Sequence, residues 1–135
     1  MIRQKDVITI RMPYPNIHSR LAKKAHMYIC KKHDIESEYE LIKCQSYKTK
    51  DLPYLNHRII EDADIRRNPF NHRSLIDCDK LFLCQNINIS DVFLTSKRRD
   101  VCSDLYDDII NELNEDGFDT ISLPAEDMKC INDVL

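Results

Sequence analysis

Glycine is almost absent from this sequence, which has a single one, Gly117, in 135 residues. Phosphate-binding loops of the G-x-G-x-x-G and P-loop types need several glycines at fixed spacing, so both are excluded. No apolar run approaches the roughly 20 residues that span a bilayer. Residues 1–12 are charged and lack the apolar stretch of a secretory signal. We therefore expect a soluble, cytoplasmic protein with no membrane contact, and its length fits one domain.

Large aromatic residues are also scarce. The chain has no tryptophan, six tyrosines and four phenylalanines, although hydrophobic residues make up 42% of it. This composition supports a folded core, but a modest one. Small domains with modest cores often gain stability by burying one face against a second copy. The sequence therefore predicts a homodimer.

The spacing of the cysteines excludes the common zinc motifs. There are six cysteines, and the closest pair, Cys78 and Cys84, is wider than the two-to-four-residue spacing of zinc ligands. A cytoplasmic chain keeps its thiols reduced, so the even number does not predict disulfides. Cys44 and Cys78 lie in apolar runs, where a free cysteine behaves as a small hydrophobic residue. No metal site and no cofactor are predicted, and neither a Gly-x-Ser-x-Gly elbow nor a His-Glu-x-x-His helix is present.

Charge is divided unevenly along the chain. Residues 1–75 hold 15 Lys and Arg against 9 Asp and Glu, whereas residues 76–135 hold 5 against 14. All five histidines lie in the first part. A basic half attracts a polyanion such as RNA because binding releases counterions, and we expect the acidic half to stay off it. Oppositely charged parts of one fold that simply neighbour each other would give the same pattern.

Short runs rich in β-branched residues predict five or six strands. They cover residues 7–12, 26–30, 39–44, 57–60 (an edge strand), 74–77 and 80–84. Alternation in the third strand places Lys43 opposite to Ile42 and Cys44. The polar run 31–34 is expected to end the second strand.

A single amphipathic helix follows the strands. Apolar residues recur every four positions, at Val101, Leu105, Ile109 and Leu113, and Gly117 is expected to stop the helix. Strands that precede one helix without alternating with helices predict a mainly β fold of the α+β class, a small antiparallel barrel, rather than a parallel sheet. We expect residues 1–115 to form this domain and residues 116–135 to be an acidic, weakly patterned extension.

Candidate functional residues gather at two strand ends. Arg20, Lys23, Lys24 and His26 lead into the second strand, and the third is followed by a second polar group, Gln45, Ser46, Tyr47 and Lys48. If these strands pair as neighbours, the start of one approaches the end of the other. A cation beside a hydroxyl suits phosphodiester chemistry, in which negative charge builds up on the phosphate oxygens. A solvated basic loop and an unrelated turn serine would contain the same residue types.

The order of these segments resembles the MazF/PemK family, the toxins of bacterial type II toxin–antitoxin modules. The run 3–10, Arg-Gln-Lys-Asp-Val-Ile-Thr-Ile, is similar to the family's opening, with Lys5 where glycine is usual. Lys24 and Ala25 stand where the family has Arg-Pro before an apolar strand, and Ser46 matches the hydroxyl residue that ends its third strand. Residues 51–60 and 74–81 are similar to later family segments, so the resemblance covers roughly residues 3–113.

The resemblance implies a small SH3-like antiparallel barrel of the MazF/CcdB type that forms a homodimer. It further implies an endoribonuclease that cleaves single-stranded mRNA without metal, leaving a 2′,3′-cyclic phosphate and a 5′-hydroxyl, under the control of a cognate antitoxin. Lys24 and Ser46 would be its catalytic residues. The residues expected to bind RNA are Arg20, Lys23, His26, Gln45, Tyr47 and Lys48.

Several assignments stay open at this point. Lysine at position 24 keeps the charge of arginine but loses its bidentate fork, so a slow or inactive member is an alternative. His18 and His26 are further acid–base candidates because histidine titrates near neutrality. The loop aromatics Tyr14, Tyr47 and Phe70 either stack on bases or pack on the barrel.

Two functions from other classes also remain. The chain could be a catalytically degenerate barrel that binds RNA or a protein partner. Alternatively, it could be a structural or regulatory module that acts through its acidic helix and tail. A cleavage assay distinguishes the first of these from an enzyme.

Overall fold

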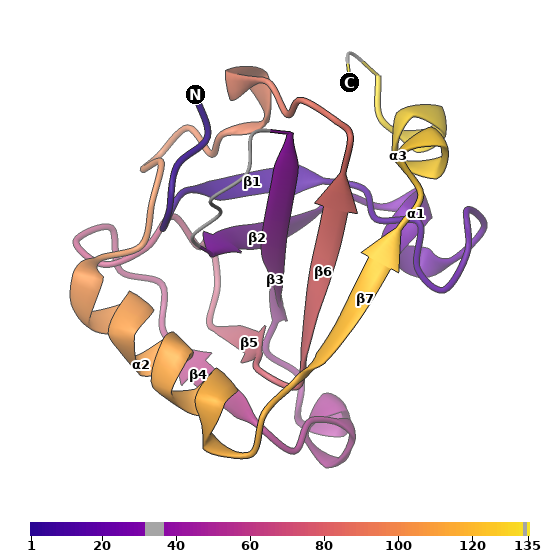
Figure 1. Ribbon diagram of the computed structural model, residues 1–135. Helices are drawn as coiled ribbons and strands as arrows, with labels where there is room; N and C mark the ends of the chain where they lie inside the picture. Colours follow the sequence, from indigo (N-terminus) through magenta and orange to yellow (C-terminus); the bar gives the residue numbers. More distant parts are fainter. Residues whose placement is uncertain (32–36, 134) are drawn as a thin grey trace.

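The fold is a curved, mainly antiparallel sheet with helices at its margins (Figure 1). The computed structural model describes residues 1–31, 37–133 and 135. Its strands are β1 (Val7–Ile10), β2 (His26–Lys31), β3 (Glu38–Ser46), β4 (Arg58–Glu61), β5 (Ser74–Asp77), β6 (Lys80–Gln85) and β7 (Asp119–Leu123). Its helices are α1 (Arg20–Lys23), α2 (Ser103–Glu115) and α3 (Ala125–Ile131), with 3₁₀ turns η1 (Thr49–Tyr54) and η2 (Asp91–Phe93).

β3 is the central strand of the sheet. On one side it pairs with β2. On the other side its first half, Glu38 to Leu41, pairs with β6, and its last three residues pair with β5. The main path of pairing runs β1-β2-β3-β5-β4, and β7 joins β6 in the one parallel pair among the described strands. The hydrogen-bonded path is therefore open rather than closed on itself, so the small barrel predicted from the sequence is not confirmed.

The six predicted strands and the predicted helix are confirmed, with ends that shift by a few residues. β4 lies at the end of the main path, as expected of an edge strand. The mainly antiparallel α+β class is likewise confirmed. The stop expected after β2 falls on residues 32–34, which lie outside the described residues.

Alternation along the strands creates two apolar cores, one on each face of the sheet. In β2, Ile29 packs into the core beneath α2, whereas Tyr28 and Cys30 belong to the other core. Of the four predicted residues, α2 contributes Leu105, Ile109 and Leu113 to its core, and Val101 joins the same core just before the helix begins; all four are at most 1% exposed. All six cysteines are free thiols. Burial raises the pKa of Cys30, Cys78 and Cys84 to about 12, so these thiols stay protonated and act as apolar groups.

The C-terminal segment is more ordered than its weak pattern suggested. The segment 116–135, expected to form an acidic extension, contributes β7 to the sheet and α3 to its margin. Leu123 and Met128 are buried in the same core as Tyr28. Exposed polar residues surround these two anchors, which explains why the sequence showed no clear period. None of the described helices is both long and apolar enough to cross a membrane.

His57 joins the start of β4 to the end of α2. Its Nδ1 lies 3.1 Å from Glu112 Oε1, and its Nε2 lies 3.0 Å from Asp116 Oδ2. Its backbone N–H donates to Asp79 at 2.8 Å. The hydrogen bond to Glu112, with the charges of Asp116 and Asp79, raises the pKa of His57 above its ordinary value. The imidazolium is thus favoured in the folded state.

This contact predicts a stability that falls as pH rises. A histidine with a raised pKa in the folded state stabilises it fully below its unfolded pKa of about 6.5, and the contribution disappears as pH passes through the folded pKa. Urea unfolding of wild type and His57→Gln, measured on both sides of this range, should differ most at the acidic end. His18→Gln is the matched control, and an identical pH dependence in wild type and His57→Gln would refute the role of this contact.

Candidate nucleic-acid interface

Pairing of β2 with β3 brings the two candidate polar groups together. The strands are antiparallel and Met27 lies opposite Cys44, so the first residues of β2 neighbour the last residues of β3. The conditional expectation from the sequence, that these two strands pair, is therefore confirmed. Polar side chains from the start of one strand and the end of the other can then share one site.

A groove of about 680 Å³ lies at this place. Seven of the eight predicted site residues line it, namely Arg20, Lys23, Lys24, His26, Gln45, Ser46 and Lys48. Lys43, Lys50, Asp51, Phe70, Asn71 and His72 complete much of the wall. Its volume is in the range of about 300–1,000 Å³ that is usual for ligand sites. The groove is the larger of the two hollows identified around α1.

α1 and the residue that follows it present three of the cations, Arg20, Lys23 and Lys24. Its single turn begins at Ser19, whose side chain accepts a hydrogen bond from the Ala22 N–H at 3.3 Å. Ala22 points into the protein and is 3% exposed, which holds the turn against the body of the fold. Lys24 then takes an extended conformation, and the chain continues directly into β2. Basic side chains at the surface of this turn are thereby fixed at the mouth of the groove.

Most of the cations that line the groove lack acidic partners, whereas seven described cations outside it have one. Elsewhere Arg67 pairs with Glu61 and Arg99 with Asp6, at 2.9 and 2.7 Å. By contrast, five cations of the groove have no ion pair or side-chain hydrogen bond to any described residue: Arg20, Lys23, Lys24, Lys48 and Lys50. The one acidic residue in the lining, Asp51, accepts a hydrogen bond from Gln45 Nε2 at 3.0 Å. The groove therefore carries a concentrated positive charge that its own walls do not neutralise.

Lys43 adds a partly buried cation to this group. As predicted, it points away from the core that contains Ile42 and Cys44, and its side chain is 13% exposed. Its Nζ lies 4.0 Å from Asp77, a carboxylate that also binds Lys80. Burial, with the charge of Lys80, lowers the pKa of Lys43. Alternation along the strand predicted the orientation of Lys43 but did not mark it as a site residue, because one lysine in an apolar strand is not distinctive.

Side chains from both faces of the β2–β3 pair line the groove. Tyr28 lies opposite Lys43, so alternation places His26 and Gln45 on the same face as these two residues. Ser46 follows Gln45 and belongs to the other face, where it is opposite Ser74 of β5. The hydroxyl of Ser46 is exposed, and the groove wraps around the end of β3.

The predicted aromatic contacts are arranged differently. Tyr47 does not belong to the groove lining; its ring lies 5.6 Å from the Arg73 guanidinium, in a cation–π contact. Tyr14 packs edge-on against Phe82 with ring centroids 5.3 Å apart. Phe70 lines the groove but is 5% exposed and belongs to the core beneath α2. Tyr14 and Phe70 therefore pack on the fold, the second of the two roles left open for them.

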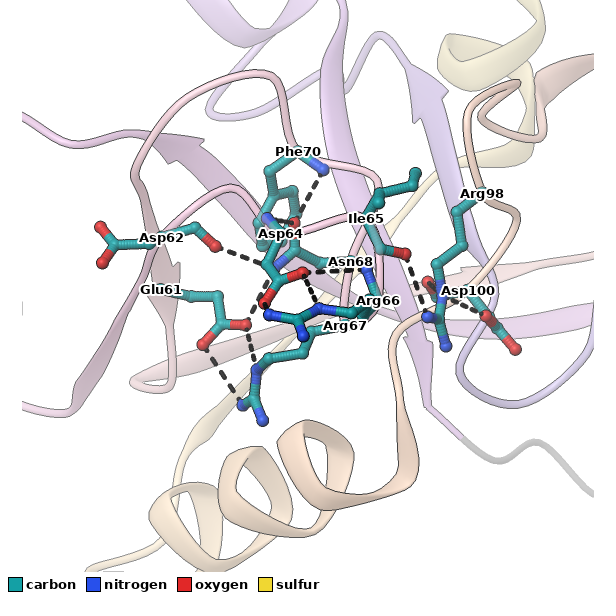
Figure 2. A network of polar contacts seen from close by, with 10 residues as sticks. All are labelled: Glu61, Asp62, Asp64, Ile65, Arg66, Arg67, Asn68, Phe70, Arg98 and Asp100. Atoms are coloured by element: carbon teal, nitrogen blue, oxygen red, sulfur yellow. Dashed lines mark hydrogen bonds and ion pairs between the residues drawn. The ribbon is translucent and has the colours of Figure 1, made fainter.

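A buried polar network holds the loop that carries Asn71 and His72, which form the far wall of the groove (Figure 2). Asn68 is fully buried and donates to Glu61 at 2.8 Å and to the Asp62 carbonyl at 3.0 Å. Its side-chain oxygen accepts from the Phe70 N–H at 3.1 Å. Phe70 is followed directly by Asn71 and His72 of the wall, so this asparagine fixes their position. The sequence showed only an Asn-Pro turn here, because the partners of Asn68 become neighbours only in the folded loop.

The described residues hold no group of three or more His, Cys, Asp or Glu side chains that could share a metal ion. The groove instead offers ammonium, guanidinium, imidazole, amide and hydroxyl groups. Such a set binds and orients phosphate oxygens directly, through charge and hydrogen bonds.

Asn68→Ala is expected to weaken both the fold and the groove. It leaves Glu61 and three backbone groups without their buried partner, which should cost about 3 kcal/mol in the free energy of unfolding. RNA affinity should fall as well, because the loop that carries Asn71 and His72 loses its anchor. Urea unfolding and RNA titration measure the two effects, with Asn111→Ala on the exposed side of α2 as the control. Equal stability of the two variants would contradict this role.

Comparisons with known proteins add no relative. The chain matches no family model, and no curated protein or solved structure is significantly similar to it. What the groove does must therefore be argued from its own residues.

Proposed function

We propose that this protein binds single-stranded RNA in the groove between α1 and the end of β3 and cleaves it there. The observation that carries the proposal is the set of five cations without acidic partners, Lys24 among them, that line the groove together with Ser46. A polyanion supplies the missing negative charges, and its binding releases counterions. RNA fits better than a small anion because the cations come from two separate segments along the groove, residues 20–24 at α1 and residues 48–50 at the start of η1.

Cleavage at this site would use the ribose 2′-hydroxyl of the RNA itself. The hydroxyl attacks the adjacent phosphorus, which leaves a 2′,3′-cyclic phosphate and a 5′-hydroxyl. The protein then has to hold the chain in line and stabilise the charge on the phosphate oxygens. In this proposal Lys24 supplies the positive charge, and Ser46 donates a hydrogen bond to the phosphate. Arg20, Lys23 and Lys48 hold the flanking backbone.

The same proposal includes the fold family and the partners. The order of strands, the position of α2 and the placement of Lys24 and Ser46 support an SH3-like barrel related to MazF/PemK toxins, working in the cytoplasm. A protein of this kind would have an antitoxin whose extended, acidic segment occupies the groove and neutralises the same cations. A catalytically degenerate barrel that binds RNA or a protein partner through this groove is the second candidate. The replacement of the family's arginine by Lys24 favours it.

Loss of Lys24 or Ser46 should abolish most cleavage. Removing one donor to the charge that develops in the transition state typically costs about 100-fold to 1000-fold in rate. Lys24→Ala and Ser46→Ala should each show such a loss in EDTA with a labelled single-stranded RNA, whereas Lys24→Arg should keep or raise the rate. Lys97→Ala, an exposed lysine outside the groove, is the matched control.

Three results would count against the enzymatic proposal. Equal rates for wild type and both alanine variants would remove Lys24 and Ser46 from the site. A strict need for Mg²⁺ would indicate a different centre. RNA binding without cleavage by wild type would favour the degenerate barrel.

The proposed homodimer is tested by light scattering. A dimer should give about twice the chain mass of 16.0 kDa at micromolar concentration. A mass of one chain that does not change with concentration would refute it.

A further inference from the structure

His26 is the residue in the groove whose hydrogen bonding fixes a free basic nitrogen. Its Nδ1 lies 2.9 Å from the backbone carbonyl oxygen of Lys24. A carbonyl oxygen can only accept a hydrogen bond, so Nδ1 is the donor and carries the proton. Nε2 of the neutral ring is then the nitrogen with the lone pair. The ring is thus held in a single tautomer at the start of β2.

The charges around His26 favour this neutral form. Partial burial lowers the pKa of His26, the hydrogen bond to the Lys24 carbonyl opposes this, and the cations Lys43, Lys24 and Arg20 lower the pKa further, so that the net shift is downward. They come from the two segments beside the ring, with Arg20 and Lys24 on the approach from α1 and Lys43 on β3. On the third side, β1 presents Ile10 opposite His26 and adds no charge. Asp51, the acidic residue of the groove, is bound by Gln45.

We propose that His26 is the general base that takes the proton from the 2′-hydroxyl of the bound RNA. This inference rests on the proposed function and names the part of the substrate that the groove recognises chemically. The proton moves from O2′ to Nε2, the O2′–P bond forms, and the P–O5′ bond breaks. The leaving O5′ takes a proton from the Lys24 ammonium. His26 then releases its proton to water, and Lys24 regains one, so both residues return to their starting states.

A base at this position makes the site selective for RNA over DNA. DNA has the same phosphates and binds the same cations, but it lacks the hydroxyl from which Nε2 takes the proton. The groove should therefore bind a DNA strand of the same sequence without cleaving it. The selectivity lies in the chemical step rather than in affinity.

The other described histidines lack this combination of features. His57 is held between two carboxylates on the far side of β4, and its pKa is raised. His18 lies in the exposed loop before α1, outside the groove lining. His72 lines the groove but is exposed on the loop that carries the far wall.

His26→Asn tests the role of His26 as a base separately from its hydrogen bond to Lys24. The amide of asparagine can still donate to the Lys24 carbonyl but has no nitrogen that accepts a proton. Loss of a general base costs about 100-fold to 10,000-fold in kcat. We expect a fall of this size with RNA affinity within about threefold of wild type. His18→Asn is the matched control and should cleave like wild type.

The pH profile supplies a readout that a structural role would not change. The wild-type kcat should rise with pH and level off with a midpoint below about 6.5, because neutral His26 is the active form. This rise should be absent from His26→Asn. Nitrogen chemical shifts of His26, measured without substrate, should show the Nδ1–H tautomer at neutral pH.

Each result decides between the two proposals. If wild type cleaves RNA while His26→Asn keeps its rate and pH profile, the role of His26 is refuted and the proposed function stands. An Nε2–H tautomer also refutes it, whether or not RNA is cleaved. If wild type does not cleave RNA at all, the proposed function fails, and the role of His26 fails with it.

Discussion

The antiparallel pairing of β2 with β3 is the constraint on which the rest of the structure depends. Its register, with Met27 opposite Cys44, is specified by burial on both faces. A slip by one residue would exchange the faces of β2 and move Ile29 and Tyr28 each into the wrong core. The same register sets where Lys24 and His26 lie relative to Gln45 and Ser46. The positions of polar groups at the groove are therefore fixed by apolar residues further along the strands.

β3 also explains why a groove forms at this end of the sheet. Its outer edge changes partner from β6 to β5 along its length. Because β3 pairs with β6 along its first half and with β5 at its end, its partner strands cannot all lie in one flat layer. Figure 1 shows β1 and β2 crossing β3, while β6 and β7 run alongside it. The curved end leaves room for α1 on one side and the loop with Asn71 and His72 on the other. The buried side chain of Asn68 fixes that loop where regular strand pairing has stopped.

Much of the sheet was predictable from local patterns, whereas the edges of the site were not. Strands such as β2 and β3 carry dense β-branched and apolar residues, and α2 repeats an apolar residue every four positions, so their sequence signals are strong. β7 and α3 each have one buried apolar residue, Leu123 and Met128. One such residue per element gives no apolar repeat from which a strand or a helix could be predicted.

The candidate site follows the same division. The residues at the ends of β2 and β3 were identifiable because one pairing brings them together. Other features of the site depend on contacts between distant segments. They are the packing of Tyr47 against Arg73, the position of Lys43 in the groove lining and the hydrogen bonds of Asn68. Such contacts have no signature in the local sequence.

Charge pairing gives the molecule a local property that its overall charge conceals. The net charge is −3, which by itself would argue against binding a polyanion. Many cations outside the groove are, however, neutralised by a carboxylate within 4 Å, as in the pairs of Arg67 and Arg99. None of the acidic residues of α2 lines the groove, and at physiological ionic strength the field of a surface charge is screened over about 8 Å. Unpaired cations that share one hollow act together over shorter distances. The positive charge of the groove is thus set by which cations lack partners, and the net charge of the whole chain has little part in it.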